Sequence, residues 1–329
     1  MVENENIMVS VCMITYNHED YISQAIEGVL MQKTKFPIEL IIGEDCSTDK
    51  TREICVEYQQ KYPEIIKLQL PEKNKGMMRN FIENMQAAQG KYIALCEGDD
   101  YWTDPYKLQR QVDFLEKNED FSICFHAVGV KKEQENVVVN DYITRDVPDV
   151  TDIYDLAQGN YIHTPSVVFR KNEEVLELTS SPNIFVIDYV LHMFNARFGK
   201  IKKLPDIMAT YRIHSSNMWV DSDNVSMSKN IVKYLKGLLN KFSSEVNQIL
   251  NKRYIDTNLY LAKHYQNTDD PNQALFYFLE ALSVPNDIIS NYFENQRSYD
   301  KVESLQKKLN RINSHIVIKI LRKIKRLFK

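Results

Sequence analysis

The sequence predicts an α/β fold with a mostly parallel central sheet, followed by an all-helical region. Short apolar runs alternate with longer amphipathic stretches up to about residue 128. Polar and acidic side chains follow the ends of several of those runs, and beyond about residue 226 helical periodicity continues without strands. Strands that alternate with helices of about ten to fifteen residues are typical of βαβ units around a parallel sheet.

The first part of the domain, residues 1–128, is expected to contain most of these units. The local signals at its helix starts are clear: Ser47, Thr48 and Asp49 are capping residues before the second helix, and Pro105 suits the first turn of the fourth. The predicted strands are 7–14, 38–43, 66–70, 92–96 and 122–128, and the predicted helices are 21–31, 48–62, 77–88 and 107–117.

The second part of the domain is less regular. We interpret residues 129–160 as a variable loop region with short extended segments at 137–139 and 142–143. A strand is expected at His163–Arg170, an apolar helix at 184–194, and a small antiparallel section at 200–207 and 208–213. Helices at 231–242, 246–264 and 272–282 form an accessory helical domain over residues 226–310. They include one hairpin like a tetratricopeptide unit, which is too few for an array.

Composition excludes several classes of protein. A chain of 329 residues with 43% hydrophobic residues is long enough for about two domains with a substantial core. The 41 basic and 45 acidic residues give a net charge of -4, so nucleic acid is not an expected partner. The five cysteines show no C-x-x-C spacing and are expected to be reduced and buried.

The chain shows no targeting segment. Residues 1–6 are polar and lead directly into a strand, which differs from a secretory signal. No apolar run approaches the roughly 18 residues that a membrane-spanning helix needs. We therefore expect a cytoplasmic protein.

A group of acids follows the apolar run 92–96. Glu97, Asp99 and Asp100 flank a single glycine there. In an open α/β sheet, ligands bind beyond the carboxyl ends of the strands, and divalent cations prefer carboxylate oxygens. The segment predicts a metal-assisted reaction on a phosphorylated substrate. The alternative is that Asp99 and Asp100 only cap the following turn.

Polar residues at the other strand ends complete a recognisable pattern. They are Thr15-Tyr16-Asn17, Gly43-Glu44-Asp45-Cys46-Ser47-Thr48-Asp49, and Asn74-Lys75-Gly76 with Arg79-Asn80. Together with Glu97-Gly98-Asp99-Asp100, this pattern resembles the glycosyltransferase family 2 enzymes through about residue 214. The resemblance implies a GT-A (Rossmann-like) domain over residues 1–225, with a nucleotide-binding half at 1–128 and an acceptor-side half at 129–225.

The resemblance also implies donor-binding residues. Asp45 would accept hydrogen bonds from the base and ribose, and Arg79 would lie near the base or the phosphates. Glu97-Gly98-Asp99-Asp100 takes the place of the DXD motif, whose carboxylates hold Mn²⁺ or Mg²⁺ against the diphosphate of a nucleotide sugar, here preferably a UDP-sugar. The expected donor-binding residues are Thr15, Tyr16, Asn17, Glu44, Asp45, Arg79, Glu97 and Asp99.

Two departures from the family pattern affect the metal ligands. Glu97 stands where Asp is usual, and Cys46 stands where Gly is usual. Asp99 and Asp100 are therefore the expected ligands. Tyr211-Arg212-Ile213-His214 resembles a later family motif whose histidine returns to the metal, so His214 is the third. The alternative for His214 is a histidine packed in the core or exposed to solvent.

On the acceptor side, the family places a carboxylate at the start of a helix. Asp188 matches by position and by its apolar surroundings, and would act as the general base of an inverting transfer. The alternative is a helix-capping Asp. The segment 163–166 would line the acceptor side, and Trp102 and Trp219 would either stack on sugar rings or belong to the core.

The tail at 311–329 is expected to be a basic amphipathic helix. Its last fourteen residues, 316–329, carry six basic residues and no acid. Most of their apolar side chains fall within an arc of about 140° on a helix of 100° per residue. Such a helix lies on an anionic membrane surface. The alternative is docking on the helical domain or on another subunit, which would give a homo-oligomer.

These inferences predict a metal-dependent inverting glycosyltransferase at the inner face of the cell membrane. It would transfer a sugar to a glycan or a lipid-linked acceptor in cell-surface polysaccharide assembly. The rival enzyme class is a nucleotidyltransferase acting on a sugar phosphate, which also uses carboxylate-held metal. The alternative that is not an enzyme is a catalytically silent binding subunit recruited to the membrane.

Overall fold

A computed structural model describes residues 6–132, 135, 137–179, 188–214, 223–285, 287–289 and 292. The chain divides into two compact units, residues 1–220 and 221–329. The domain boundaries after residues 225 and 310 stay predictions. The predicted tail helix at 311–329 and Trp219 lie outside the described residues.

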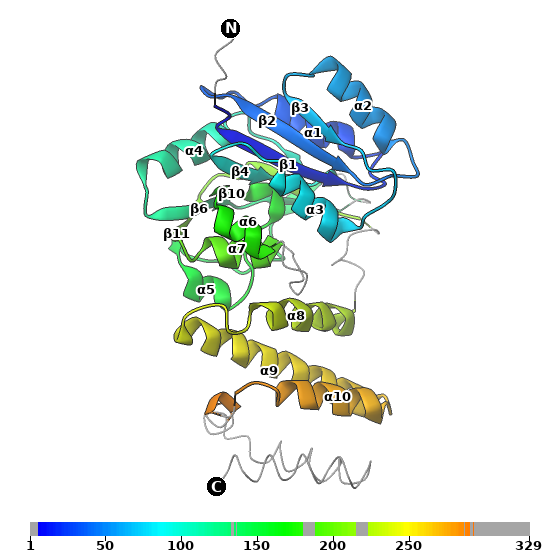
Figure 1. The fold of residues 1–329 in the computed structure, drawn as a ribbon, viewed down its shortest axis with the longest axis vertical. Coiled ribbons are helices and arrows are strands. Elements are labelled where there is room, and N and C mark those ends of the chain that lie inside the picture. Colours follow the sequence, from blue (N-terminus) through cyan, green and yellow to red (C-terminus); the bar gives the residue numbers. More distant parts are fainter. Residues whose placement is uncertain are drawn as a thin grey trace. The chain divides into compact units, whose positions relative to one another are not determined.

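The first unit is built on an eight-stranded sheet (Figure 1). Its strand order is β3-β2-β1-β4-β10-β6-β11-β9. Strands β10 and β9 are antiparallel to their neighbours, and the other pairs are parallel, which confirms the mostly parallel sheet. The strands are β1 (Val9–Thr15), β2 (Ile38–Glu44), β3 (Ile66–Gln69), β4 (Tyr92–Leu95), β6 (Phe121–His126), β9 (Val150–Thr151), β10 (Val168–Arg170) and β11 (Lys200–Leu204).

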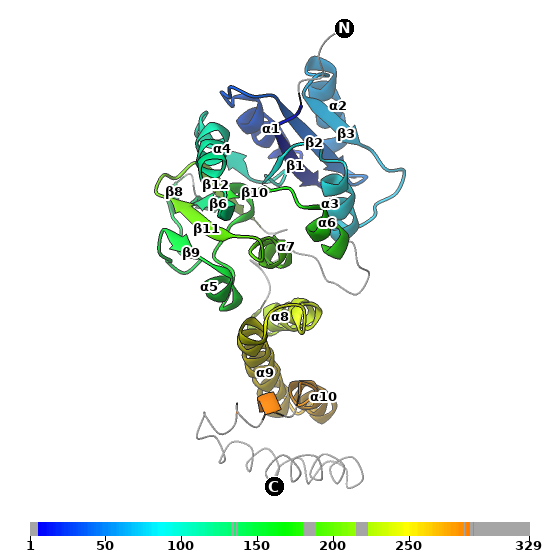
Figure 2. The same ribbon diagram turned by 60° about the vertical axis from the view of Figure 1, so that its left-hand side comes forward.

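Helices cover both faces of this sheet (Figure 2). Helices α1 (Ile22–Leu30), α2 (Thr51–Lys61) and α4 (Lys107–Lys117) share one hydrophobic core with Val11 and Met13 of β1. Cys12 points the other way, because side chains alternate along a strand, and its Sγ lies 3.9 Å from the Asn84 carbonyl oxygen of α3. The other face therefore carries α3 (Met77–Gln86), and α6 (Glu173–Thr179) and α7 (Asp188–Asn195) follow on that face.

A second, four-stranded sheet has the order β5-β12-β7-β8. Its strands are β5 (Tyr101–Trp102), β12 (Ala209–Ile213), β7 (Gly129–Lys132) and β8 (Val138–Asn140). Strand β5 directly follows the acids at 97–100, and β12 directly precedes His214. Because β5 and β12 pair, with Ala209 opposite Trp102, the small sheet brings two distant parts of the chain together.

Two predictions for the second part of the domain are wrong. Residues 200–213 do not form an antiparallel section: β11 runs parallel to β6 in the large sheet, and β12 joins the small sheet. Pro205 lies between them and cannot donate a backbone hydrogen bond to a sheet. The strand predicted at His163–Arg170 is reduced to β10, because Thr164–Ser166 form a 3-10 turn around Pro165. Ser166 Oγ closes that turn by donating to the His163 carbonyl at 2.7 Å.

The predicted loop region at 129–160 contains more structure than expected. Strands β7, β8 and β9 lie within it, together with the short helix α5 (Ile153–Ala157). Asp152 caps α5 by accepting hydrogen bonds from the amides of Tyr154 and Asp155. The extended segment at 137–139 corresponds to β8, whereas 142–143 is not a strand.

The second unit contains the three predicted helices, which are α8 (Asn224–Leu238), α9 (Ser244–Asn267) and α10 (Pro271–Ala281). Helix α9 packs against both neighbours. Ser243 caps α9, and Asp270 caps α10. Among the helices that the structure describes, none combines the length and the apolar character that crossing a membrane requires.

Lys107 is an unusual member of the core at the start of α4. It has no exposed surface, its Nζ donates to Gln111 Oε1 at 2.8 Å, and it lies 4.2 Å from the centre of the Trp102 ring. Trp102 is itself buried, and its indole N–H donates to the Pro165 carbonyl at 2.9 Å. Trp102 is therefore a core residue and not a sugar-stacking one. Burial lowers the pKa of Lys107 to about 7.

Replacing Lys107 by methionine is expected to change how stability depends on pH. Between pH 7 and 8 the unfolded state, whose lysine has an ordinary pKa of 10.5, binds more protons than the folded state. The free energy of unfolding of the wild type should therefore rise with pH relative to Lys107→Met, by up to about 1.4 kcal/mol per pH unit. Urea denaturation of both proteins at pH 7 and pH 8 measures this difference. Equal changes in the two proteins would show that Lys107 does not titrate there.

Candidate active site

The acid cluster is formed where the chain leaves β4 and turns towards β5. The Gly98 N–H donates to the Ile14 carbonyl at 2.9 Å, which brings this turn against the end of β1. A Cβ at position 98 would lie 2.5 Å from Thr15 Oγ1, so only glycine permits this approach. Glu97, Asp99 and Asp100 place oxygens within 4.8 Å of one another.

Asp99 is held by two histidines. His214 Nε2 lies 3.0 Å from Asp99 Oδ2, and His18 Nε2 lies 3.9 Å from the same oxygen. Burial alone would raise the pKa of Asp99, but the bond from His214 and the nearby His18 hold it below its usual value. His18 is fixed in turn by Thr15, whose Oγ1 lies 3.1 Å from His18 Nδ1. The Asp99 carboxylate is therefore held in place by contacts with neighbouring side chains.

Asp100 is held on one side only. Its Oδ1 accepts the Arg212 backbone N–H at 2.8 Å, while its Oδ2 is buried and has no hydrogen-bond partner among the described residues. Burial, then the charges of Asp99 and Glu97, raise the pKa of Asp100 well above its usual value. Burying a carboxylate oxygen without a partner costs free energy, and a bound cation or a proton would offset that cost.

Arg212 connects the small sheet to the acid cluster. Its Nη1 donates to the Asp99 carbonyl oxygen at 2.6 Å, its guanidinium lies 4.4 Å from the Tyr101 ring centre, and Gln24 accepts a further bond. These contacts use the guanidinium within the protein. Arg212 thus orients the acid-bearing turn.

The donor set fits a divalent cation. Glu97 is half-buried, and burial together with the charges of Asp99 and Asp188 raises its pKa to about 8. Carboxylates packed so closely repel one another unless a cation or a proton neutralises them. Carboxylate oxygens with nearby imidazole nitrogens suit Mn²⁺ or Mg²⁺, and His18, Asp99 and His214 form a second group with the necessary spacing.

Glu44 and Asp45 lie at the carboxyl end of β2, beside the end of β1. Both carboxylates are buried and already have protein partners. Asp45 accepts the backbone N–H groups of Lys75 and Gly76, each at 2.8 Å, and so fixes the loop before α3. Glu44 pairs with Arg52 and accepts the Ser47 N–H. These two acids shape the loops around the end of the sheet.

Tyr16, Asn17 and Arg79 are exposed at the same end of the sheet. Asn17 has a positive φ of 54°, and its Oδ1 accepts the Thr48 N–H at 2.8 Å. Tyr16 has 43% of its surface exposed. Arg79 lies in the first turn of α3, where its Nε donates to Glu83 Oε1 at 2.8 Å, so its side chain lies along the helix.

Asp188 begins α7 and belongs to a different part of the fold. Its Oδ2 accepts Asn160 Nδ2 at 3.2 Å and Thr164 Oγ1 at 3.5 Å, and its Oδ1 accepts the Tyr189 N–H at 2.7 Å. Its charge raises the pKa of Glu97, so Asp188 lies near the acid cluster.

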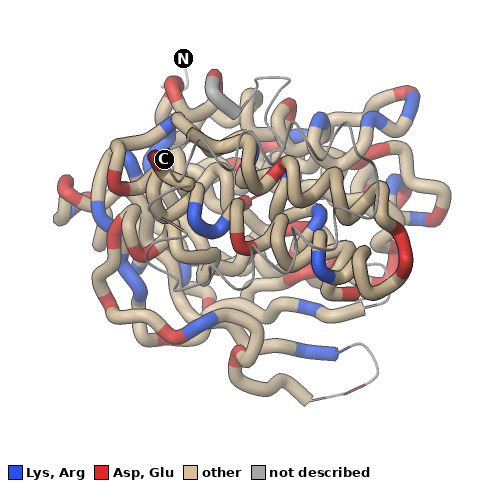
Figure 3. The backbone as a smooth tube through the Cα atoms, turned by 90° about the horizontal axis from the view of Figure 1, so that it is seen from below, with Lys and Arg blue, Asp and Glu red and all other residues tan. Residues whose placement is uncertain are grey.

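His18 and Asn160 were not anticipated from the sequence. His18 follows Thr15-Tyr16-Asn17 directly and could have been noticed as a metal-ligand type at a strand end. Asn160 carries no local signal, because its importance comes from a contact with Asp188 across 28 residues. Figure 3 shows basic and acidic residues interspersed along the described backbone. Within the acid cluster, Asp99 and Asp100 are buried.

Comparisons with known proteins agree with this architecture. Residues 10–171 match the model of glycosyl transferase family 2. The chain is 39% identical over 211 residues to an uncharacterized protein of Mycobacterium tuberculosis, covering 64% of this chain and 60% of that one. It is 31% identical over 224 residues to an uncharacterized glycosyltransferase of Nostoc sp., covering 64% and 66%. The match thus spans about 60% of the length of the mycobacterial relative.

Solved structures share the fold. Residues 1–349 of Staphylococcus aureus TarS in complex with UDP-GlcNAc align with a TM-score of 0.58 at 16% identity, covering 83% of this chain and 90% of that one. The mannosyltransferase PcManGT from Pyrobaculum calidifontis, in complex with GDP-Man and Mn²⁺, aligns with a TM-score of 0.53 at 15% identity, covering 84% and 75%. The sequence matches show that the chain belongs to glycosyltransferase family 2 over residues 10–171, and the structural alignments show that it has the GT-A fold.

Proposed function

We propose that this chain is a metal-dependent inverting glycosyltransferase that moves a sugar from a nucleotide sugar to a glycan or a lipid-linked acceptor. The observation that carries the proposal is the convergence of Glu97, Asp99 and Asp100, with oxygens within 4.8 Å of one another beyond the carboxyl end of β4. Asp188 is a separate carboxylate near them. The three clustered acids suit a metal ion, and Asp188 suits a general base.

Asp188 would take the proton of the acceptor hydroxyl at Oδ2. Asn160 and Thr164 position that oxygen, at 3.2 and 3.5 Å, while the first turn of α7 holds Oδ1. As the proton leaves, the hydroxyl oxygen would attack the anomeric carbon on the face opposite the nucleotide. The bond from that carbon to the diphosphate oxygen would break, and the nucleoside diphosphate would leave with the electron pair. The configuration at that carbon is inverted.

Asp99, Asp100 and His214 would hold Mn²⁺ or Mg²⁺, with Glu97 and His18 beside them. When bound, the metal ion neutralises charge on the departing nucleoside diphosphate. Arg212 keeps the turn at 99–100 in place through the Asp99 carbonyl and the Asp100 carboxylate.

The donor is proposed to be a nucleotide sugar, with UDP as the preferred nucleotide. TarS has been solved with UDP-GlcNAc, and PcManGT with GDP-Man and Mn²⁺, which supports this class of donor. Residues at the ends of β1 and β2 would line the base and ribose, and Arg79 would approach the base or the phosphates. The residues proposed to line them are Thr15, Tyr16, Asn17, Glu44 and Asp45.

A panel of UDP- and GDP-sugars tests the function. Each is incubated with the protein and Mn²⁺ or Mg²⁺, and the released nucleotide is identified by chromatography. Metal-dependent release of UDP or GDP supports a glycosyltransferase. Release of pyrophosphate from a nucleoside triphosphate and a sugar phosphate would support a nucleotidyltransferase instead. Tight binding of UDP and Mn²⁺ without turnover for any donor or acceptor would favour the silent binding subunit.

We place this activity in cell-surface polysaccharide assembly at the inner membrane face. The support is the sequence of the tail at 316–329, where each basic residue near an anionic surface contributes up to about 1 kcal/mol. Lipid-linked acceptors would be found at that surface.

Truncation after Asn313 is expected to release the protein from anionic liposomes. The cause is the joint loss of the apolar stripe and the basic residues, and cosedimentation with phosphatidylglycerol vesicles measures it. A full-length variant with the tail Lys and Arg residues replaced by Gln separates the two contributions, because it keeps the apolar stripe. Unchanged sedimentation of the truncated protein would instead favour docking of the tail on the protein.

A further inference from the structure

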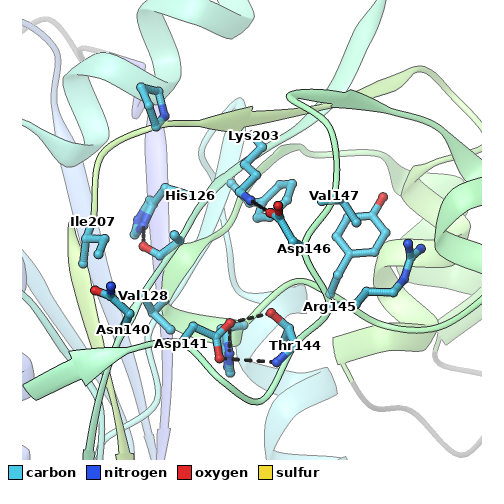
Figure 4. Close-up of a pocket in the computed structure, with 15 residues that line it drawn as sticks. His126, Val128, Asn140, Asp141, Thr144, Arg145, Asp146, Val147, Lys203 and Ile207 are labelled. Carbon is cyan, nitrogen blue, oxygen red and sulfur yellow. Dashed lines mark hydrogen bonds and ion pairs between the residues drawn. The ribbon is translucent and has the colours of Figure 1, made fainter.

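A cavity of about 330 Å³ lies apart from the acid cluster, beyond the carboxyl end of β6 (Figure 4). Its walls come from three segments: the end of β6 with the residues after it, residues 140–147, and the end of β11 with the residues after it up to Ile207. Tyr161 and His163 complete the lining. This volume is at the lower end of the roughly 300–1,000 Å³ of small-molecule sites.

The cavity adjoins the proposed base through two consecutive residues. His163 lines the cavity, while the next residue, Thr164, donates to Asp188 Oδ2 at 3.5 Å. On its other side, the His163 ring packs against Tyr211 with 4.9 Å between ring centres. Burial, then the charges of Asp100 and Glu97, raise the pKa of Tyr211, which places Tyr211 near the acid cluster. One peptide unit therefore separates His163 in the cavity wall from Thr164, whose side chain bonds Asp188, the proposed general base.

His126 supplies a buried hydrogen-bond acceptor in the cavity wall. It has 1% of its surface exposed, and its Nδ1 lies 2.7 Å from the Ala127 carbonyl oxygen. A carbonyl only accepts, so Nδ1 carries the proton and the neutral ring leaves Nε2 as an acceptor. Burial lowers the pKa of His126 well below its usual value, which keeps the ring neutral. Nε2 has no hydrogen-bond partner among the described residues.

Several polar groups of the wall contact one another. Asp146 accepts from Lys203 at 2.7 Å, and Asp141 lies 3.1 Å from His163 Nε2. The Arg145 guanidinium lies 4.9 Å from the centre of the Tyr161 ring. Figure 4 shows four charged residues around the same space as apolar side chains. The charged residues are Asp141, Arg145, Asp146 and Lys203, and the apolar ones are Val128, Val147 and Ile207. A wall with balanced charges, many polar atoms and apolar patches suits a neutral ligand with hydroxyl groups.

We propose that this cavity binds a sugar unit of the acceptor and that His126 Nε2 accepts a hydrogen bond from one of its hydroxyl groups. The proposal rests on the proposed glycosyltransferase function. A sugar ring has hydroxyls for Nε2 and for the paired acids and bases, and C–H faces for the apolar patches. The bound unit would lie next to the acceptor sugar whose hydroxyl reacts at Asp188. The cavity would therefore select acceptors by the sugar that neighbours the attachment point.

Binding of simple glycosides tests the proposal on the full-length protein. The probes are methyl glycosides of glucose, galactose, mannose and N-acetylglucosamine, observed by saturation-transfer NMR in the presence of UDP and Mn²⁺. At least one should bind the wild type. Ile207→Trp fills the cavity and should abolish that signal. Ile143→Trp is the matched control, because Ile143 is exposed to 48% against 46% for Ile207 and does not line the cavity.

His126→Phe removes the acceptor nitrogen and keeps a ring of similar size, and it also removes the Nδ1–H bond to the Ala127 carbonyl. Loss of one hydrogen bond of about 0.5–1.5 kcal/mol should weaken binding of the glycoside by roughly two- to thirteenfold. Thermal unfolding of each variant shows whether it is folded, and Ile207→Trp provides a second result if His126→Phe is not. Absence of binding by all four probes, or binding that survives Ile207→Trp, would overturn the proposal.

Donor hydrolysis separates this proposal from the proposed function. If the wild type hydrolyses a nucleotide sugar but no glycoside binds, the cavity proposal fails and the function stands. If a glycoside binds in the cavity but no donor is hydrolysed or bound, the function fails, and with it the assignment of the cavity to an acceptor.

Discussion

Asp188→Asn is expected to abolish sugar transfer while leaving donor binding intact. An amide cannot take the proton of the acceptor hydroxyl, and a positioned general base typically contributes about 10²- to 10⁴-fold to a rate. We therefore expect kcat to fall by about that factor and the donor KM to stay near the wild-type value. Transfer kinetics with the best donor and acceptor from the panel give both constants.

The structure explains why this variant should fold. The partners of Asp188 are the Asn160 amide, the Thr164 hydroxyl and the Tyr189 backbone N–H. An asparagine oxygen can still accept the Tyr189 N–H at the start of α7, so this contact is kept. Removing a negative charge near Glu97 also reduces the repulsion among the acids.

Asp152→Asn is the matched control. Asp152 is another acid at a helix start, where it caps α5, and asparagine caps helices about as well as aspartate. This variant should transfer sugar at the wild-type rate. Normal turnover by Asp188→Asn would show that the general base is another residue. Equal losses of kcat in both variants would show that the losses come from changes at helix starts and not from lost proton transfer.

Local sequence signals were sufficient for the elements that carry the acid cluster. The apolar run at 92–96 followed by acids predicted a buried strand and a polar turn, and the structure has β4 and the turn at 97–100. Helix α4 was predicted with its observed bounds, Lys107–Lys117, because apolar side chains recur there at helical spacing. Pro105 was expected in the first turn, but it lies before the N-cap residue Tyr106. Signals of this kind are contained within a few residues.

Pairing between distant segments could not be predicted in the same way. Strand β10 is inserted antiparallel between β4 and β6, yet its apolar sequence would suit either direction. Strand β5 has only two residues, Tyr101–Trp102, and becomes a strand because β12 pairs with it more than 100 residues later. The bond between the Arg212 N–H and Asp100 depends on that pairing.

The partners of buried polar groups were the other part that the sequence left undecided. Asp45 was predicted to contact the donor, and this prediction did not include the protein groups that Asp45 and Arg212 bind. In the structure, Asp45 holds the backbone at Lys75 and Gly76, and Arg212 holds the Asp99 carbonyl oxygen. A residue type shows which bonds a side chain can make, whereas the fold determines which groups reach it.

Asp99→Asn is expected to remove metal-dependent donor binding. Asp99 is the residue shared by both potential metal groups, and it is the acid that His214 and His18 approach. Loss of a residue that only orients a metal ligand costs about 10- to 100-fold in affinity, and loss of a ligand should cost more than that. We expect Mn²⁺ to give no added affinity for UDP in titration calorimetry.

The control for Asp99→Asn is Asp49→Asn at a nearby loop. Asp49 accepts the backbone N–H groups of Thr51 and Glu19, at 2.9 and 3.0 Å, and asparagine can make one of these bonds. Metal-dependent UDP binding should survive this change. If it also survives Asp99→Asn, the cluster is not the diphosphate-metal site, and the gathering of three acids in one turn would need another cause. If it is lost only in Asp99→Asn, the buried charge is the cation-binding group, because the two substitutions remove the same charge and differ in where it lies.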